Sequence, residues 1–128
     1  MVQVDSSLAP TLRTITEEAA KKGITVVWIS GYRSIEKQKE LYDAWIASNK
    51  RGLPASEPGS SYHNYGLAAD FVATGGPYLT VGLLAKDVGL RWGGDFTDYP
   101  DPVHIDMGRD MTIAQAKALG YPLKLEDV

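Results

Sequence analysis

The first half of the chain shows two patterns of apolar residues, one helical and one extended. Apolar positions recur at spacings of three and four between residues 8 and 22, which predicts an amphipathic helix ended by Gly23. The β-branched run at residues 24–29 predicts a buried strand. Ser34 can cap a second helix. The apolar stripe of that helix consists of Leu41, Tyr42, Trp45 and Ile46.

The rest of the chain predicts shorter elements and longer loops. Residues 50–61 contain two prolines and two glycines, which predicts a loop. Thr112 can cap a last short helix that runs to residue 118. Two strands and one further helix are expected at residues 67–72, 103–107 and 79–88.

These elements predict a single α+β domain over residues 1–128. Helices and a few strands are interspersed, which favours a small antiparallel sheet flanked by helices over a doubly wound sheet. A chain of 128 residues is one domain by size, and it contains no linker-like segment and no internal repeat.

Composition and charge exclude several classes of binding partner and of active site. The net charge of −3 argues against nucleic acid, so attraction to an acidic substrate must be local. The absence of cysteine excludes disulfides, thiolate metal sites and a cysteine nucleophile. No stretch approaches the roughly 20 apolar residues of a membrane span, and no signal peptide is visible. We expect a monomer that is made in the cytoplasm.

The two histidines of the chain lie in the two segments with the most candidate chemistry. His63, Asp70 and His104 form a set that suits a catalytic zinc, because three protein ligands leave a fourth position for water. His63 and Asp70 would be roughly 23 Å apart on a continuous strand, so the chain must turn back between them. Residues 64–66 have turn chemistry. Spacing alone leaves open a polar loop histidine and an unrelated strand aspartate.

Asp101 precedes His104 by three residues, where a general base would be useful. Pro102 pushes Asp101 out of the helical region, and a tight local geometry can keep both side chains near one site. The alternative is ordinary Asp-Pro turn chemistry beside a buried histidine. Other acidic residues compete for the same role: Asp95, Asp98 and Asp106.

Four motifs, in the same order, resemble those of one family of bacterial and phage cell-wall metallopeptidases. Residues 61–70 (Ser-x-His-x-x-Gly-x-Ala-x-Asp) resemble the first zinc motif of the D-alanyl-D-alanine carboxypeptidase and L-alanyl-D-glutamate endopeptidase family. Residues 30–42 resemble its arginine motif, with Arg33 and Gln38. Residues 89–96 and Asp101-x-x-His104 resemble its third segment.

The resemblance implies a peptidase with zinc in a groove on the sheet, held by His63, Asp70 and His104. It implies Asp101 as the general base and Arg33 as the cation that stabilises the oxyanion of the transition state. Asp95 is a candidate for orienting a ligand histidine. The candidate substrate-binding residues are Gln38, Ser61, Tyr62 and Trp92. The alternatives are that Gln38 supports Arg33, that Ser61 bonds to the ligand loop and that the aromatic residues only pack.

The resemblance also suggests the bond that is cut. Many relatives carry glutamate at the position of Asp101, whereas aspartate there and the stretch at residues 92–95 resemble the L-alanyl-D-glutamate branch. We therefore expect hydrolysis of that bond in peptidoglycan stem peptides, by a phage-type endolysin that reaches the wall through a holin-type pore. The alternatives are a D,D-carboxypeptidase or dipeptidase, and a catalytically silent, zinc-stabilised wall-binding module.

Overall fold

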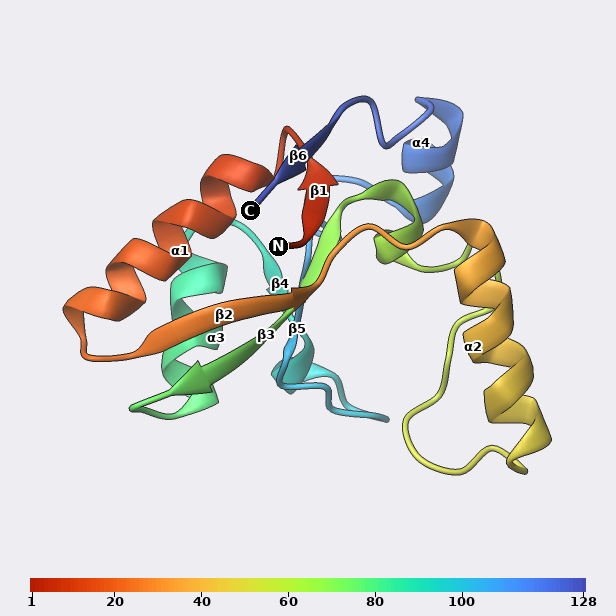
Figure 1. Ribbon diagram of the computed structural model, residues 1–128, viewed down its shortest axis with the longest axis horizontal. Coiled ribbons are helices and arrows are strands. Elements are labelled where there is room, and N and C mark those ends of the chain that lie inside the picture. The colour runs from red at the N-terminus through yellow and green to blue at the C-terminus, as the bar shows by residue number, and fades with distance from the viewer.

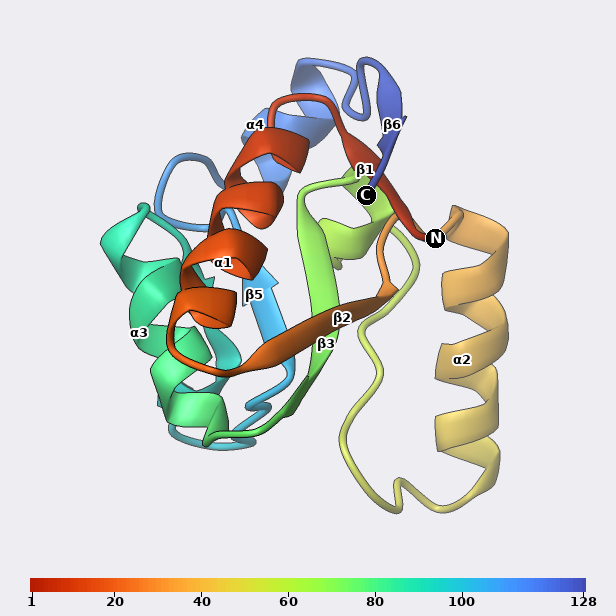
Figure 2. The same cartoon turned by 60° about the vertical axis from the view of Figure 1, so that its left-hand side comes forward.

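A four-stranded antiparallel sheet forms the centre of the computed structural model, which describes residues 1–128 (Figure 1). The strands follow the order β2 (Thr25–Ser30), β3 (Ala68–Thr74), β5 (His104–Asp106) and β4 (Arg91–Trp92). Helices α1 (Ala9–Lys21) and α3 (Tyr78–Asp87) pack together beside the sheet (Figure 2). The predicted fold class is confirmed, and the predicted helices and strands lie within two residues of the observed ones.

The core lies between these two helices and one face of the sheet. Alternate residues of β3 point toward the helices, and Phe71 is completely buried there. Its ring contacts Trp28 edge-to-face, with centroids 5.8 Å apart. Leu12 and Ile15 of α1 supply the opposite side of this core. The other residues of β3, including Asp70, therefore point away from the helices.

Helix α2 (Ile35–Ala47) stands apart from the sheet, on the side away from α1 and α3 (Figure 2). Ser34 caps it as predicted, because its hydroxyl accepts a hydrogen bond from the Lys37 amide at 3.0 Å. The predicted apolar stripe does not join the core. Leu41 and Trp45 are only partly buried and line a groove that faces the sheet.

The two ends of the chain pair with each other, which the sequence did not indicate. Strand β1 (Gln3–Asp5) is antiparallel to β6 (Leu125–Asp127). The buried Asp5 carboxylate fixes this pair by accepting hydrogen bonds from the amides of Leu123 and Lys124 at 2.7 and 3.1 Å. Helix α4 (Ile113–Ala118) has the predicted Thr112 cap. No helix in the fold has the length and apolar character needed to cross a membrane.

Candidate metal centre and active site

The register of the sheet brings polar side chains together on the face away from α1 and α3. Ser30 and His104 are the cross-strand neighbours of Asp70, on β2 and β5 respectively. Direct partners in an antiparallel sheet share one face. A bulge in β2 places Ser30, instead of Ile29, opposite Asp70. Asp70 is therefore the centre of a polar row that crosses three strands.

His63 reaches this row from a 3₁₀ turn, Tyr62–Tyr65, that leads into β3. The Ser61 hydroxyl caps the turn by accepting a hydrogen bond from the His63 amide at 3.2 Å. Gly66 ends it with a φ of +69°, a conformation that favours glycine. The predicted reversal of the chain between His63 and Asp70 is confirmed.

The predicted ligands converge with the spacing of a zinc site. Nε2 of His63 and Nδ1 of His104 lie 3.3 and 3.2 Å from the same oxygen, Oδ1 of Asp70. These separations are longer than the roughly 2.7–2.9 Å typical of charge-assisted hydrogen bonds. Bond lengths of about 2.0–2.1 Å to zinc give tetrahedral edges of about 3.3 Å. One atom from each residue can therefore bind a single ion, and all three atoms lie within 4.8 Å of one another.

Hydrogen bonds from the remaining ring nitrogens orient both histidines. Nδ1 of His63 lies 2.8 Å from the Gly31 carbonyl oxygen. Nε2 of His104 lies 2.8 Å from Oδ2 of Asp106. Such contacts are typical of metal-binding histidines, whose other N–H donates to a carbonyl or a carboxylate. The donor set thus fits zinc in both chemistry and orientation.

The charges at the site also suit a cation. Burial opposes ionisation of Asp70, but hydrogen bonds and charges from His104 and His63 outweigh it and lower the pKa of Asp70. Burial also opposes the charged form of His104, which by itself would lower its pKa. The hydrogen bonds of His104 to Asp106 and Asp70 outweigh burial and raise this pKa to about 9. The buried carboxylates therefore stay ionised and attract positive charge to this point.

Asp101 lies beside the donor set and lines the same groove. Its backbone amide donates to the Gly93 carbonyl at 2.8 Å. A Cβ at Gly93 would lie 2.2 Å from the Asp101 carbonyl oxygen, so this approach requires glycine. Burial raises the pKa of the Asp101 carboxyl, Asp70 adds to this, and His104 and His63 oppose it. A raised pKa suits a group that must accept and later release a proton.

Arg33 lines the groove without a carboxylate partner. Nη1 donates to Oε1 of Gln38 at 3.0 Å, and the Arg33 amide donates to the His63 carbonyl at 2.9 Å. Burial lowers the pKa of Arg33, and the nearby Asp70 opposes this. A half-buried guanidinium with unused donors can bind an oxyanion.

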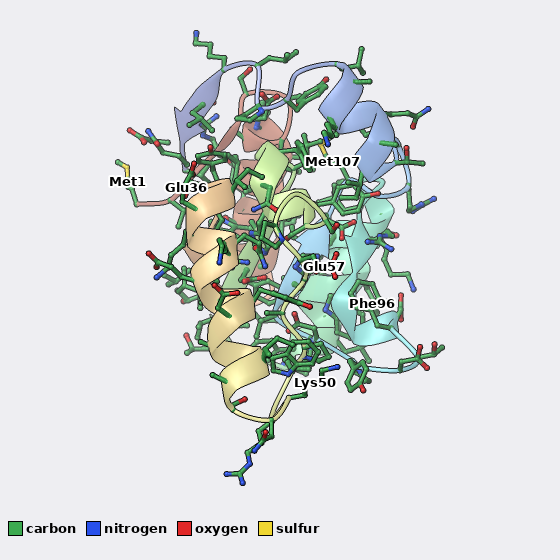
Figure 3. The ribbon with its side chains drawn as sticks, turned by 90° about the vertical axis from the view of Figure 1, so that its right-hand side faces the viewer. Met1, Glu36, Lys50, Glu57, Phe96 and Met107 are labelled. Atoms are coloured by element: carbon green, nitrogen blue, oxygen red, sulfur yellow. The ribbon has the colours of Figure 1, made fainter.

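The site residues lie in a groove of about 660 Å³ between the sheet and α2. Its α2 side is largely apolar, with Leu41, Trp45 and Leu53, and its sheet side carries the candidate ligands. In Figure 3, α2 lies at the left of the molecule and Phe96 lies at the right. This volume is in the range of small-molecule and peptide sites.

The predicted substrate-binding residues lie in different environments. Ser61 and Tyr62 line the groove, although the Tyr62 hydroxyl donates to the Met111 carbonyl at 2.8 Å. Gln38 is buried, and its amide nitrogen donates to the Ser56 carbonyl at 2.8 Å while its oxygen accepts from Arg33. Gln38 therefore supports Arg33 and joins α2 to the loop across from it.

The predicted substrate contact of Trp92 does not fit its position. Trp92 is 8% exposed, belongs to the core and does not line the groove. Its indole N–H donates to the Pro102 carbonyl at 2.8 Å. Trp92 therefore supports the segment that carries Asp101, from the core side of that segment.

The residue that orients His104 is Asp106, and the prediction of Asp95 for such a role is wrong. Asp95 lies at the surface and pairs with Lys86 at 2.7 Å. Asp106 is buried against His104. The spacing of His104 and Asp106 in the sequence indicates this contact, because residues i and i+2 of a strand share a face.

Comparison with known proteins identifies the family of this chain. A family model described as VanY, D-alanyl-D-alanine carboxypeptidase, matches residues 1–88. The segment with Asp101 and His104 lies beyond that match, so its place in the site comes from the geometry above. The chain is also 32% identical to the peptidoglycan L-alanyl-D-glutamate endopeptidase CwlK of Bacillus subtilis (strain 168), over 81% of this chain and 75% of that protein.

Two solved structures share the fold. VanYB in complex with D-alanine-D-alanine is 26% identical, with a TM-score of 0.68 over 91% of this chain and 76% of that chain. A mutant of the vancomycin-resistance D,D-pentapeptidase VanY in complex with Zn(II) is 22% identical. Its TM-score is 0.67 over 89% of this chain and 83% of that chain. With the family model matched over most of the chain, and the endopeptidase matched over three quarters of its length, this protein belongs to the VanY family of D-alanyl-D-alanine carboxypeptidases.

Proposed function

We propose that this protein is a zinc peptidase that hydrolyses peptidoglycan stem peptides at the L-alanyl-D-glutamate bond. One observation carries the proposal. The donor set of His63, Asp70 and His104 shares one groove with an acid, Asp101, and with an unpaired cation, Arg33. A silent binding module has no need of that acid. The similarity to an L-alanyl-D-glutamate endopeptidase and the aspartate at position 101 support the choice of bond.

Each groove residue has a separate role in the proposed mechanism. Zinc held by the three ligands supplies Lewis-acid chemistry, making water more acidic and polarising a carbonyl group. Asp101 accepts a proton from the attacking water and returns it to the departing amine. Arg33 donates hydrogen bonds to the oxygen on which negative charge develops. Gln38 holds the Arg33 guanidinium at the groove.

A D,D-carboxypeptidase is the second candidate, because the matched family model carries that description. Mass spectrometry of purified, defined peptidoglycan fragments after digestion separates the two. We expect products cut between L-alanine and D-glutamate, with the D-alanine end intact. Release of single D-alanine residues instead would establish the carboxypeptidase activity and refute the proposed bond.

We also propose that the protein is a monomer with an endolysin-type role. Lysis assays test the role, and light scattering tests the oligomeric state.

Zinc binding is expected to strengthen with pH, with one zinc bound per chain. Protons and zinc compete for the His104 ring, whose pKa in the metal-free protein is about 9. The proton on His104 stabilises the metal-free fold below about pH 6.5, and this contribution is lost as the pH rises to 9. Apparent zinc affinity should therefore rise about tenfold between pH 7 and 8 and then level off as the pH passes 9. Chelator competition at several pH values measures this.

The matched control for that titration is His63→Ala, which removes one ligand. This variant should lose most of its zinc at every pH, since three ligands become two. Full zinc retention in His63→Ala would remove His63 from the metal site. An affinity that does not change between pH 7 and 9 would show that zinc binding displaces no proton from His104.

A further inference from the structure

We propose that Asp106, held in place by Arg91, is a positioning residue that makes Nδ1 of His104 the nitrogen available to the metal. This inference rests on the proposed zinc site and deepens it. Asp106 forms hydrogen bonds with His104, Arg91 and Gly108, and with none of the groove's other candidate ligands or Arg33. It acts through His104 alone.

The strand geometry explains why Asp106 meets His104. The two residues lie two apart on β5, so their side chains share the face that carries Asp70. Nε2 of His104 is 2.8 Å from Oδ2 of Asp106, and an ionised carboxylate can only accept. Nε2 must therefore carry the hydrogen. The lone pair of a neutral ring is then on Nδ1, the atom that lies 3.2 Å from Asp70.

Three further hydrogen bonds prevent the Asp106 carboxylate from turning away. Nε and Nη2 of Arg91 donate to its two oxygens, each at 2.7 Å, in a bidentate pair. The Gly108 amide donates to Oδ1 at 2.8 Å. Arg91 on β4 is the direct cross-strand partner of Asp106, so the register of the sheet sets this pair. Asp106 is fully buried, and these hydrogen bonds compensate its charge.

Arg91 is itself fixed between two aromatic rings. Its guanidinium carbon lies 5.3 Å from the ring centre of Tyr62 and 5.1 Å from that of Phe96. Both rings line the groove. A continuous set of contacts thus runs from two groove-lining rings through Arg91 and Asp106 to Nε2 of His104, the ring nitrogen that leaves Nδ1 for the metal.

The first test needs no substitution. Long-range ¹H–¹⁵N NMR of the zinc-loaded protein, labelled on its two histidines, reports which ring nitrogen binds the metal. We expect His104 to bind through Nδ1 with a protonated Nε2, and His63 to bind through Nε2. Zinc on Nε2 of His104 would overturn the inference, because that nitrogen cannot donate to Asp106 at the same time.

The second test measures zinc affinity by chelator competition. Asp106→Asn offers an amide N–H to the ring in place of a pure acceptor, so it permits the wrong tautomer. Loss of such a partner typically weakens metal binding about 10–100-fold. We expect a loss of this size for Asp106→Asn and a loss in the same direction for Arg91→Met. The matched control, Asp95→Asn, changes a surface aspartate that contacts no histidine and should leave affinity unchanged.

The outcomes separate this inference from the proposed function. If the wild-type protein binds no zinc, the proposed zinc peptidase fails. If the wild type binds zinc and a folded Asp106→Asn binds it equally well, only the positioning role fails. A fall in thermal stability without any change in zinc affinity would make Asp106 purely structural. Should Asp106→Asn fail to fold, Arg91→Met and the wild-type NMR spectrum still decide the question.

Discussion

Replacing Asp101 with asparagine is expected to lower kcat/KM about 10²–10⁴-fold while zinc content and fold remain as in the wild type. Asparagine has nearly the same shape but cannot accept the proton of the attacking water. It also suits turns, so the segment before Pro102 should keep its conformation. Hydrolysis of a defined stem peptide, zinc analysis and circular dichroism measure the three quantities.

Asp98→Asn is the matched control for this experiment. Asp98 is exposed in the same loop and does not line the groove with the candidate ligands. It should therefore keep wild-type activity. If a zinc-loaded Asp101→Asn protein hydrolysed the peptide at a near-normal rate, Asp101 would be only a turn residue. The silent wall-binding module predicts no hydrolysis by the wild type at all.

Arg33→Ala is expected to lower kcat about 10²–10³-fold, with a smaller effect on KM. The guanidinium is held at the groove by Gln38 and has no carboxylate partner, so its free donors can meet a developing oxyanion. Interactions of this kind act mainly in the transition state, which places the loss in kcat. Steady-state kinetics on one peptide substrate separate the two constants.

Arg109→Ala controls for the general effect of removing an arginine. Arg109 is exposed and does not line the groove, so its loss should leave kcat unchanged. Unchanged kcat/KM in Arg33→Ala, together with a clear fall in melting temperature, would make Arg33 structural. That result is physically reasonable, because the Arg33 side chain also donates to Gln38, a buried residue that joins α2 to the loop at Ser56.

Local sequence signals predicted the elements that have their own start and stop residues. Ser34 and Thr112 cap the helices they were expected to cap, because a side-chain oxygen beside free amides acts within one turn. Residues 64–66 gave the reversal between the first two ligands. These features depend on neighbours in sequence, so the chain itself is sufficient to reveal them.

The missed features depend on residues that are distant in sequence. Strands β1 and β6 have three residues each and pair across the whole chain, so neither has a local pattern long enough to recognise. The apolar stripe of α2 was found, but periodicity shows which face is apolar and not what covers it. In this fold the stripe lines a groove. The position of Trp92 near a motif does not decide its role, because an aromatic residue there can belong to the core or to a binding surface.

The pairing of the chain ends makes the two termini part of the assembly of the groove. On its side facing the site, β1 accepts a hydrogen bond from the Tyr32 amide through Gln3 and donates one from Asp5 to the Gly66 carbonyl. These contacts fix the segments that carry Arg33 and His63. On its other side β1 is held by residues 123–127, which follow every candidate ligand along the chain. A chain leaving the ribosome therefore contains every candidate ligand before it can close this clamp. The groove can therefore be completed only after residues 123–127 have been added to the chain.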